Sequence, residues 1–398
     1  MRTRRFANLR ELREKLLGYQ RDAVSRLGNI PLDRLRDIEE GRDAPTVSEL
    51  EVLSALYGLA PEVLAEEPIA LQPGDGIEVM ASLDEFREVS DATKSRIVAV
   101  SNAAVDLADL RRRIGVAPEP FKWTLLPPRT AETRPWAVGK HYAERLRAHL
   151  RLGDQPIRSV RDLVRDAFPE VSVLHGHLGD GGLAGLTFAD RRRGLVIVLN
   201  LDGKNTNPCV RRFSIAHELC HLLVDWNRKE PLATLSGFLS EKALEREQCA
   251  NSFAVRLLCP EKVVRSFAKR YGAVKALEFL TRDYGVHLEA ARLYLQNAAD
   301  KQVPPEDVPL LGISAITAQW EGAEAPRDVL EFPLEDVPAE RRTLVANLAS
   351  QLYSRGGLLR DHFARLLGVT PAHDVEQVLY RFGLDAPLSR EVGQRCNS

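Results

Sequence analysis

The sequence predicts an α+β chain that is mostly helical, with a four- to five-helix domain at its N-terminus, a small sheet near its middle and a helical C-terminal region. Apolar residues recur at spacings of three and four along most of the 398 residues. Short apolar runs typical of strands lie between residues 171 and 200. This length is sufficient for two or three domains. We expect the parts to be 1–67, 68–135, 136–300 and 301–398.

The composition excludes several classes of protein. The 55 basic and 56 acidic residues balance, so the chain as a whole has no field that would attract a polyanion. The five cysteines are odd in number and form no C-x-x-C pair, which fits a reducing compartment better than a disulfide framework. No run of 18 apolar residues and no apolar signal-peptide core is present. We therefore expect a cytoplasmic protein with no membrane partner.

The N-terminal segment has apolar residues at helical spacing in four short runs. Gly28-Asn29 and the stretch 41–45 separate some of these runs, and such clusters are typical of turns. Thr46 or Ser48 is placed to cap the fourth helix. These features predict a small helical domain over residues 1–67.

Part of this domain resembles a known DNA-binding family. Residues 35–46 read LRDIEEGRDAPT, which resembles the end of the recognition helix and the following turn of Cro/C1-type (XRE) helix-turn-helix domains. The resemblance implies that the helix 31–40 enters the major groove of DNA. The candidate DNA contacts are Asn29, Arg34 and Arg36. Asp33 is unfavourable beside phosphates, so the alternative is a domain for protein recognition or for homodimer formation.

The region 68–135 is predicted to join two domains. Residues 83–114 have the periodicity of one or two helices, and the prolines that follow indicate an extended linker. No catalytic pattern is visible there.

The next region is predicted to begin with helices 139–151 and 156–168 and to continue into a sheet. Three strands are expected, at Val171–Leu174, Leu183–Phe188 and Leu195–Asn200. The last two are joined by the polar turn 189–194. His175 and His177 alternate on or after the first strand, where they could mimic a metal pair. Because they lack a helical partner, we expect them on the surface.

The stretch 211–226 carries the strongest chemical pattern, and it reads RRFSIAHELCHLLVDW. On a helix His217 and His221 lie on one face, so both imidazoles can bind one metal ion. Glu218 lies beside that ion, where it can act as a general base on an attacking water. The alternative interpretation is a buried helix with two incidental histidines.

A catalytic zinc site needs a third protein ligand, and a second helix offers one. Glu247 shares the apolar face of the stretch 247–260 with Ala250 and Ala254, which are small enough to allow close packing against the first helix. An unpaired carboxylate on an apolar face is costly, and a metal is a natural partner for it. Glu245 lies about 200° away around the helix and is expected to face solvent. The alternative for Glu247 is a partly exposed carboxylate at a helix start.

Together the two helices resemble a family of enzymes. The pairing of RRFSIAHELCHLL with E-x-x-A-N-x-F-A-x-x-L-L-x-P is similar to the ImmA/IrrE family of zinc metallopeptidases. The resemblance implies a zincin-like α+β domain in which His217, His221 and Glu247 hold Zn²⁺ and Glu218 is the general base. It also implies an edge strand that binds an extended substrate. Cys220 replaces the small residue common in the family, and a thiol there can make the site sensitive to oxidants.

The remaining sequence is expected to be helical. Helices at 263–271, 273–284 and 288–298 should support the peptidase core. A loop-rich stretch is expected from Pro304 to Pro338, followed by amphipathic helices near residues 341–355, 358–367 and 375–382. Their apolar stripes fit a core or a dimer surface, and no functional motif is visible in this region.

The two resemblances together imply a regulator with a protein substrate. The expected function is a helix-turn-helix protein fused to a zinc-dependent endopeptidase that regulates transcription by cleaving a repressor or antitoxin-like protein after a signal such as stress. The substrate is expected to be a small regulator encoded nearby. The alternative is a DNA-binding regulator whose peptidase-like domain is a non-catalytic sensor of a ligand or partner. A third interpretation is an antitoxin-like partner of a neighbouring gene product.

Overall fold

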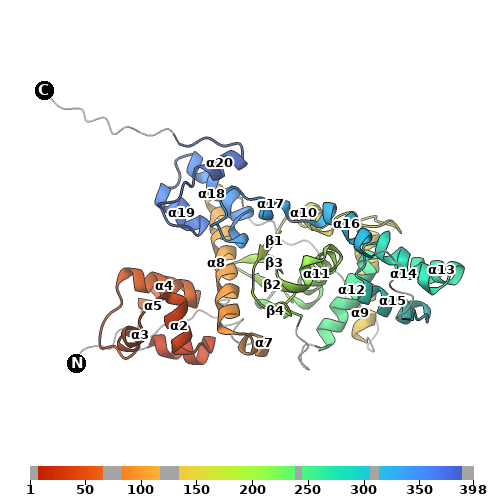
Figure 1. Cartoon of the computed structure of the whole chain (residues 1–398), viewed down its shortest axis with the longest axis horizontal. Helices are drawn as coiled ribbons and strands as arrows, with labels where there is room; N and C mark the ends of the chain where they lie inside the picture. Colours follow the sequence, from red (N-terminus) through yellow and green to blue (C-terminus); the bar gives the residue numbers. More distant parts are fainter. Residues whose placement is uncertain (1–7, 66–82, 117–133, 238–243, 305–312, 388–398) are drawn as a thin grey trace. The chain divides into compact units, whose positions relative to one another are not determined.

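The computed structural model describes residues 8–65, 83–116, 134–237, 244–304 and 313–387 (Figure 1). The chain forms two compact units. One contains residues 1–105 and 118–325, and the other contains residues 106–117 and 326–398. In the described residues, no helix is both long and apolar enough to cross a membrane. The predicted fold class, mostly helical with a small sheet, is confirmed.

The N-terminal helices form the predicted helix-turn-helix domain. They are α1 (Asn8–Glu11), which continues as the π-helix η1 (Leu12–Leu17), α2 (Arg21–Gly28), α3 (Leu32–Glu39), α4 (Val47–Tyr57) and α5 (Pro61–Ala65). Asn29 ends α2 in the left-handed conformation at φ 49°. Thr46, rather than Ser48, caps α4, and its side chain forms a capping box with Glu49.

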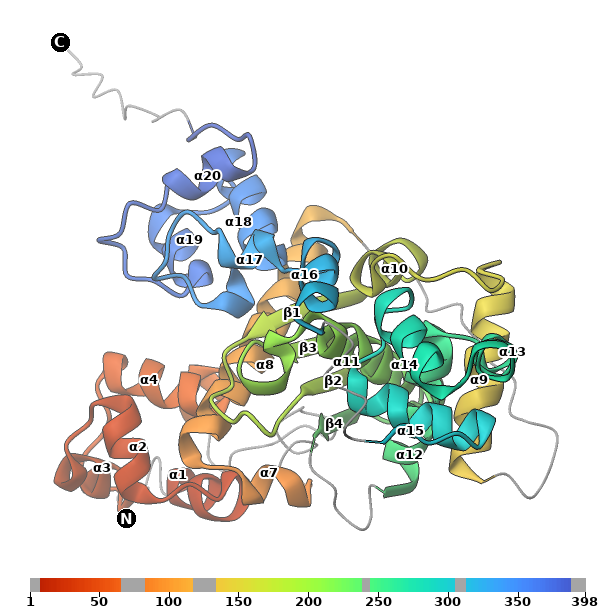
Figure 2. The same ribbon diagram turned by 45° about the vertical axis from the view of Figure 1, so that its right-hand side comes forward.

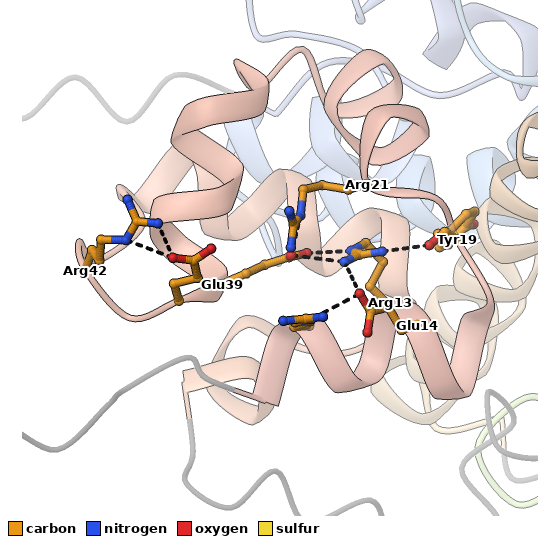
Figure 3. Close-up of polar contacts among 8 residues, drawn as sticks. Arg13, Glu14, Tyr19, Arg21, Glu39 and Arg42 are labelled. Atoms are coloured by element: carbon orange, nitrogen blue, oxygen red, sulfur yellow. Dashed lines mark hydrogen bonds and ion pairs between the residues drawn. The ribbon is translucent and has the colours of Figure 1, made fainter.

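A buried ion-pair network joins the first helix to α3 (Figure 3). Arg13 Nε donates to Glu39 Oε1 over 2.6 Å, and Arg21 Nε donates to Glu39 Oε2 over 2.9 Å. The Glu39 side chain is fully buried, and Arg13 also donates to the Tyr19 carbonyl. Removing one partner of a buried pair typically costs about 3–5 kcal/mol, so this network fixes the orientation of α3.

Two helices occupy residues 83–116, namely α7 (Asp84–Glu88) and α8 (Asp91–Ile114). Ser101 of α8 accepts a hydrogen bond of 2.7 Å from Arg193 Nε in the turn that precedes β3. Arg193 is buried and also pairs with Asp190. This part of α8 is therefore tied to one end of the sheet.

The sheet has four described strands in the order β1-β3-β2-β4 (Figure 1). They are β1 (Val171–Gly176), β2 (Gly185–Asp190), β3 (Gly194–Asn200) and β4 (Leu232–Ser236). β1 pairs with β3 in parallel, whereas β2 is antiparallel to both β3 and β4. The three predicted strands are confirmed, and β4 was not predicted.

Helices cover one face of this sheet and enclose the main core (Figure 2). The first four are α9 (Pro135–His149), α10 (Val160–Ala167), α11 (Pro208–Cys220) and α12 (Leu244–Leu258). On β3, Leu195, Ile197 and Leu199 alternate into this core. α9 and α12 cross at Gly139, where an added Cβ would lie 2.1 Å from the carbonyl oxygen of Cys249. Only a glycine permits this close crossing.

Four further helices complete this unit. Three of them were predicted, namely α13 (Glu261–Tyr271), α14 (Ala273–Arg282) and α15 (Leu288–Ala299). The fourth, α16 (Ile313–Glu324), lies where a loop-rich stretch was expected, so that expectation was wrong. α16 packs against α11, and the unit extends to Ala325.

A buried ion pair holds α16 against α11. Arg212 Nη1 lies 2.7 Å from Glu324 Oε1, and both side chains are fully buried. The Arg212 guanidinium also lies 4.0 Å from the ring centroid of Trp320, whose indole N–H donates to the Thr281 carbonyl. α16 contains three alanines, which favour a helix, and also Gly322, which does not, and the contact with α11 helps to hold it as a helix.

The second unit is helical. Its described elements are the end of α8, α17 (Arg327–Leu330), the 3₁₀ turn η5 (Ala339–Arg341), α18 (Leu344–Ser354), α19 (Arg360–Leu367) and α20 (Gln377–Arg381). Arg341 pairs with Asp106 of α8 over 2.7 Å. Tyr353 stacks on Phe363 with ring centroids 4.6 Å apart, and this pair joins α18 to α19.

Candidate metal centre

The histidine-bearing helix α11 starts from a well-defined cap. Asn207 accepts a hydrogen bond from the Cys209 backbone N–H, and Pro208 occupies the first helical position. After Cys220 the α-helix continues as the π-helix η3 (His221–Asp225). Short π-helical segments often lie at functional sites, and this one begins at His221.

Three side chains from α11, η3 and α12 converge. The Nε2 atoms of His217 and His221 lie 3.1 Å apart. Glu247 Oε2 lies 3.3 Å from His217 Nε2, and Glu247 Oε1 lies 3.5 Å from His221 Nε2. All three residues are buried, and one ligand atom from each lies within 4.8 Å of the others. No other such group was found in the described part of the chain.

Two side chains outside the cluster orient the imidazoles of His217 and His221. His217 Nδ1 lies 3.1 Å from Asn251 Oδ1, and His221 Nδ1 lies 2.6 Å from Asp225 Oδ2. Because acceptors face both Nδ1 atoms, the ring hydrogens belong there, and the two Nε2 atoms point their lone pairs at one another. Such an arrangement is stable only when a positive centre lies between the Nε2 atoms. The residues present therefore fit a metal ion.

The charges around the histidines lead to the same conclusion. Burial alone would raise the pKa of Glu247, but the neighbouring imidazoles of His217 and His221 outweigh burial and lower it to about 2. Burial alone would lower the pKa of His221, but its bonds to Asp225 and Glu247 raise it to about 10. The pocket therefore stabilises positive charge, which a divalent cation would supply in place of a proton. Two imidazoles and one carboxylate are a typical ligand set of catalytic zinc.

Glu218 lies beside this cluster with its two carboxylate oxygens in different environments. Its side chain is fully buried, and Oε2 accepts a hydrogen bond of 2.6 Å from Thr187 Oγ1 of β2. Oε1 is buried and has no hydrogen-bond partner among the residues that the structure describes. Thr187 was not predicted as a site residue, and its only signal in the sequence is a hydroxyl within an otherwise apolar strand.

Two more residues complete the surroundings of the histidines. Ser236 Oγ, at the end of β4, lies 3.5 Å from His221 Nε2, and it was missed because β4 was not predicted. Cys220 is buried, and burial is the main reason that the pKa of its thiol lies well above the ordinary value. The thiol is therefore protonated and poorly reactive, although oxidant sensitivity at this position stays a prediction.

The structure also shows where the other residues that were considered as metal ligands lie. Glu245 is exposed on α12, as predicted. His177 is exposed and lies 2.8 Å from Asp202, whereas His175 is buried on β1, so the surface expectation was wrong for His175. His175 is buried because it lies on β1, where nearly all side chains on both faces are covered by the rest of the fold. Neither histidine joins the metal cluster.

The candidate DNA contacts lie around the start of α3. Arg34 donates to Glu49, Asp43 and the Ala44 carbonyl, so its guanidinium is engaged within the domain. Arg36 pairs with Asp33 over 2.6 Å and remains about half exposed. Asn29 serves as the left-handed cap of α2. Their role toward DNA stays a prediction.

Comparison with known protein families agrees with the description of the N-terminal helical domain and of the region that carries the histidines. Residues 170–296 match the family model described as the IrrE N-terminal-like domain, a peptidase family. Residues 9–64 match the helix-turn-helix family model. No curated protein matches the chain. The chain therefore joins an XRE-type helix-turn-helix domain to an IrrE N-terminal-like peptidase domain, as the resemblance to the ImmA/IrrE family predicted.

Proposed function

We propose that this chain is a zinc-dependent endopeptidase that regulates transcription by cleaving a regulatory protein when a signal is received. One observation carries the proposal. His217, His221 and Glu247 converge on one point, and beside them Glu218 has a buried oxygen with no partner among the described residues. A structural metal site would be closed by a fourth protein ligand, whereas three ligands with an adjacent free carboxylate oxygen are typical of hydrolysis.

The residues divide the chemistry between them. Zinc held by His217, His221 and Glu247 would supply a Lewis acid for the scissile carbonyl and for water. Glu218 is placed to accept a proton from the attacking water and to return it to the leaving amine. Asp225 and Asn251 hold the two imidazoles in the orientation that binding requires.

The sheet edge indicates the form of the substrate. β4 pairs with β2 in the described residues, and its last residue, Ser236, lies 3.5 Å from His221 Nε2. An extended peptide can add to such an edge through main-chain hydrogen bonds. The substrate we propose is therefore a protein with an accessible, extended segment, such as a repressor or antitoxin-like regulator encoded nearby.

The helix-turn-helix domain supports a regulatory role. It supplies a recognition helix, α3, of the type that binds in the major groove. We propose that it brings the peptidase to DNA where the regulator is bound. The alternative is a domain that recognises a protein, and the engagement of Arg34 in internal ion pairs favours that alternative.

A single substitution tests the enzymatic part. Glu218→Gln keeps the size of the side chain and removes the base, so it should preserve zinc and folding and abolish proteolysis. Wild type and variant are expressed in the native host under candidate stresses, and the neighbouring regulator is followed by immunoblot together with the transcripts it controls. Glu245→Gln is the matched control, because Glu245 is exposed on α12.

The expected result is loss of the regulator with wild type and with Glu245→Gln, but not with Glu218→Gln. If Glu218→Gln induces the same transcripts while the regulator stays intact, catalysis is not the mechanism. The peptidase-like domain would then be a non-catalytic sensor of a ligand or partner.

A further inference from the structure

We propose that Thr187 and Gly185 of β2 fix the carboxylate of Glu218 so that Oε1 alone serves as the base. Thr187 is in this view a positioning residue, because it acts through Glu218. The inference rests on the proposed peptidase function, and it assigns different roles to the two oxygens of one side chain.

The first support is the position of the Thr187 hydroxyl. β2 is an inner strand between β3 and β4, where Thr187 lies opposite Ile197 and Thr234. Thr187 is fully buried, and because β2 is paired on both sides, its backbone cannot move without disturbing both ladders. Its Oγ1 lies 2.6 Å from Glu218 Oε2 and 3.4 Å from the Glu218 carbonyl oxygen. The single hydroxyl hydrogen goes to the nearer, charged acceptor, which makes a strong charge-assisted hydrogen bond.

The second support is the absence of a side chain at Gly185. Gly185 and Thr187 are two residues apart on β2, so they face the same side of the sheet. A Cβ at Gly185 would lie 2.8 Å from Glu218 Oε1 and 2.8 Å from the Val198 carbonyl oxygen. No carbon atom fits at that distance. The missing side chain therefore provides the space that Oε1 occupies.

The third support is the state of Oε1 itself. It is buried and has no hydrogen-bond partner in the described part of the chain, whereas Oε2 of the same carboxylate accepts the Thr187 hydroxyl. An unpaired buried oxygen on a carboxylate is costly, so its presence in a folded protein points to a functional role. With Oε2 fixed by Thr187, the carboxylate cannot turn away, and Oε1 stays available for the proton of the attacking water.

The inference predicts separable effects on turnover and on binding. Thr187→Val removes the hydroxyl at nearly constant shape, so cleavage of the regulator should lose about 10- to 100-fold in kcat with KM and zinc content unchanged. Thr187→Ser keeps a hydroxyl and should recover most of that loss. Gly185→Ala should also lower kcat, because its Cβ displaces Oε1.

Ser172 offers a matched control outside the proposed site. It lies on β1, away from β2, is buried, and its hydroxyl has no hydrogen-bond partner among the described residues. Ser172→Ala therefore also removes a buried hydroxyl from the sheet, and it should leave kcat unchanged. Equal kcat losses in Thr187→Val and Ser172→Ala, or a loss that Thr187→Ser does not restore, would overturn the positioning role.

A second measurement needs no substrate. The full-length, metal-free chain is compared by calorimetry as wild type, Thr187→Val, Glu218→Ala and the double variant. If the hydroxyl acts on Glu218, the shifts in melting temperature are not additive, because the second substitution removes a contact already lost. Additive shifts contradict the inference even if proteolysis is confirmed. Coupled shifts without any proteolysis would instead contradict the proposed function and leave the contact intact.

Discussion

The guanidinium of Arg34 and the carboxylate of Glu49 are joined by two hydrogen bonds of 2.8 Å each. Glu49 also accepts a bond from the Thr46 backbone N–H, so one carboxylate serves both the cap of α4 and the start of α3. Arg34 is the main cause of a pKa of about 2 for Glu49. A residue that the sequence offers as a DNA contact is thus an internal link between two helices.

This link should make the stability of the helix-turn-helix domain depend on pH. The pKa of Glu49 is depressed from 4.5 to about 2, so its contribution is complete above 4.5 and is lost as the pH falls toward about 2. Glu49→Gln should cost about 1 kcal/mol at neutral pH, as a lost cap does. Thermal unfolding followed by circular dichroism should show that the difference from wild type shrinks at acid pH. A difference that is constant with pH would exclude the ion pair as its cause.

Arg36 is the better test of DNA binding, because it remains partly exposed while Arg34 is engaged. If the domain reads DNA, the full-length chain should bind its own promoter with an affinity that falls with salt. Arg36→Ala should then weaken binding about tenfold without loss of stability. Arg34→Ala should weaken binding and also lower the melting temperature.

Binding is measured by fluorescence anisotropy at several salt concentrations. Lys15→Ala is a control, because Lys15 is exposed on the first helix and pairs with Glu11. Equal affinity for promoter and random DNA at every salt concentration would favour the protein-recognition alternative.

The metal site predicts that substitutions at two carboxylates of α12 differ in their effect on zinc content. The purified chain should contain about one zinc, and His217→Ala or Glu247→Ala should lose it. Glu245→Ala should retain it, because Glu245 is exposed and Glu247 faces the histidines. Elemental analysis after dialysis measures the content. Zinc retained in Glu247→Ala would place the third ligand elsewhere.

The ion pairs between α11 and α16 differ in burial, so they should differ in energy. Glu324→Gln leaves Arg212 without its counter-charge in the interior and should cost about 3–5 kcal/mol. Glu321→Gln removes the neighbouring pair with Arg211, in which Glu321 is 44% exposed, and should cost under about 1 kcal/mol. Chemical unfolding followed by circular dichroism compares the two variants. Similar losses would mean that burial of the pair is not what stabilises α16.

The sequence predicted the elements whose signal is local. The spacing of His217 and His221 placed both on one helix face, and Glu247 was assigned from the apolar face of a second helix; the structure brings the three together. Thr46 was among the predicted caps because its chemistry is read from a few adjacent residues.

The elements that were missed depend on distant partners. β4 is a short edge strand whose pairing with β2 specifies it. α16 has a weak apolar pattern and is held by Arg212, more than a hundred residues earlier. Thr187 donates its hydrogen bond to Glu218 because the fold brings β2 beside α11, a contact between residues 31 positions apart. Such contacts cannot be derived from local spacing.

The position of Glu324 has a practical consequence for anyone who truncates this protein. The family match ends at residue 296, so a fragment designed on homology would stop before α16. Its Arg212 would then be an uncompensated cation on the same helix as His217, and the Trp320 ring that covers it would be missing. Expression of such a fragment should yield insoluble or metal-poor material, whereas a stop codon after Ala325 keeps Arg212, Trp320 and Glu324 in one fragment.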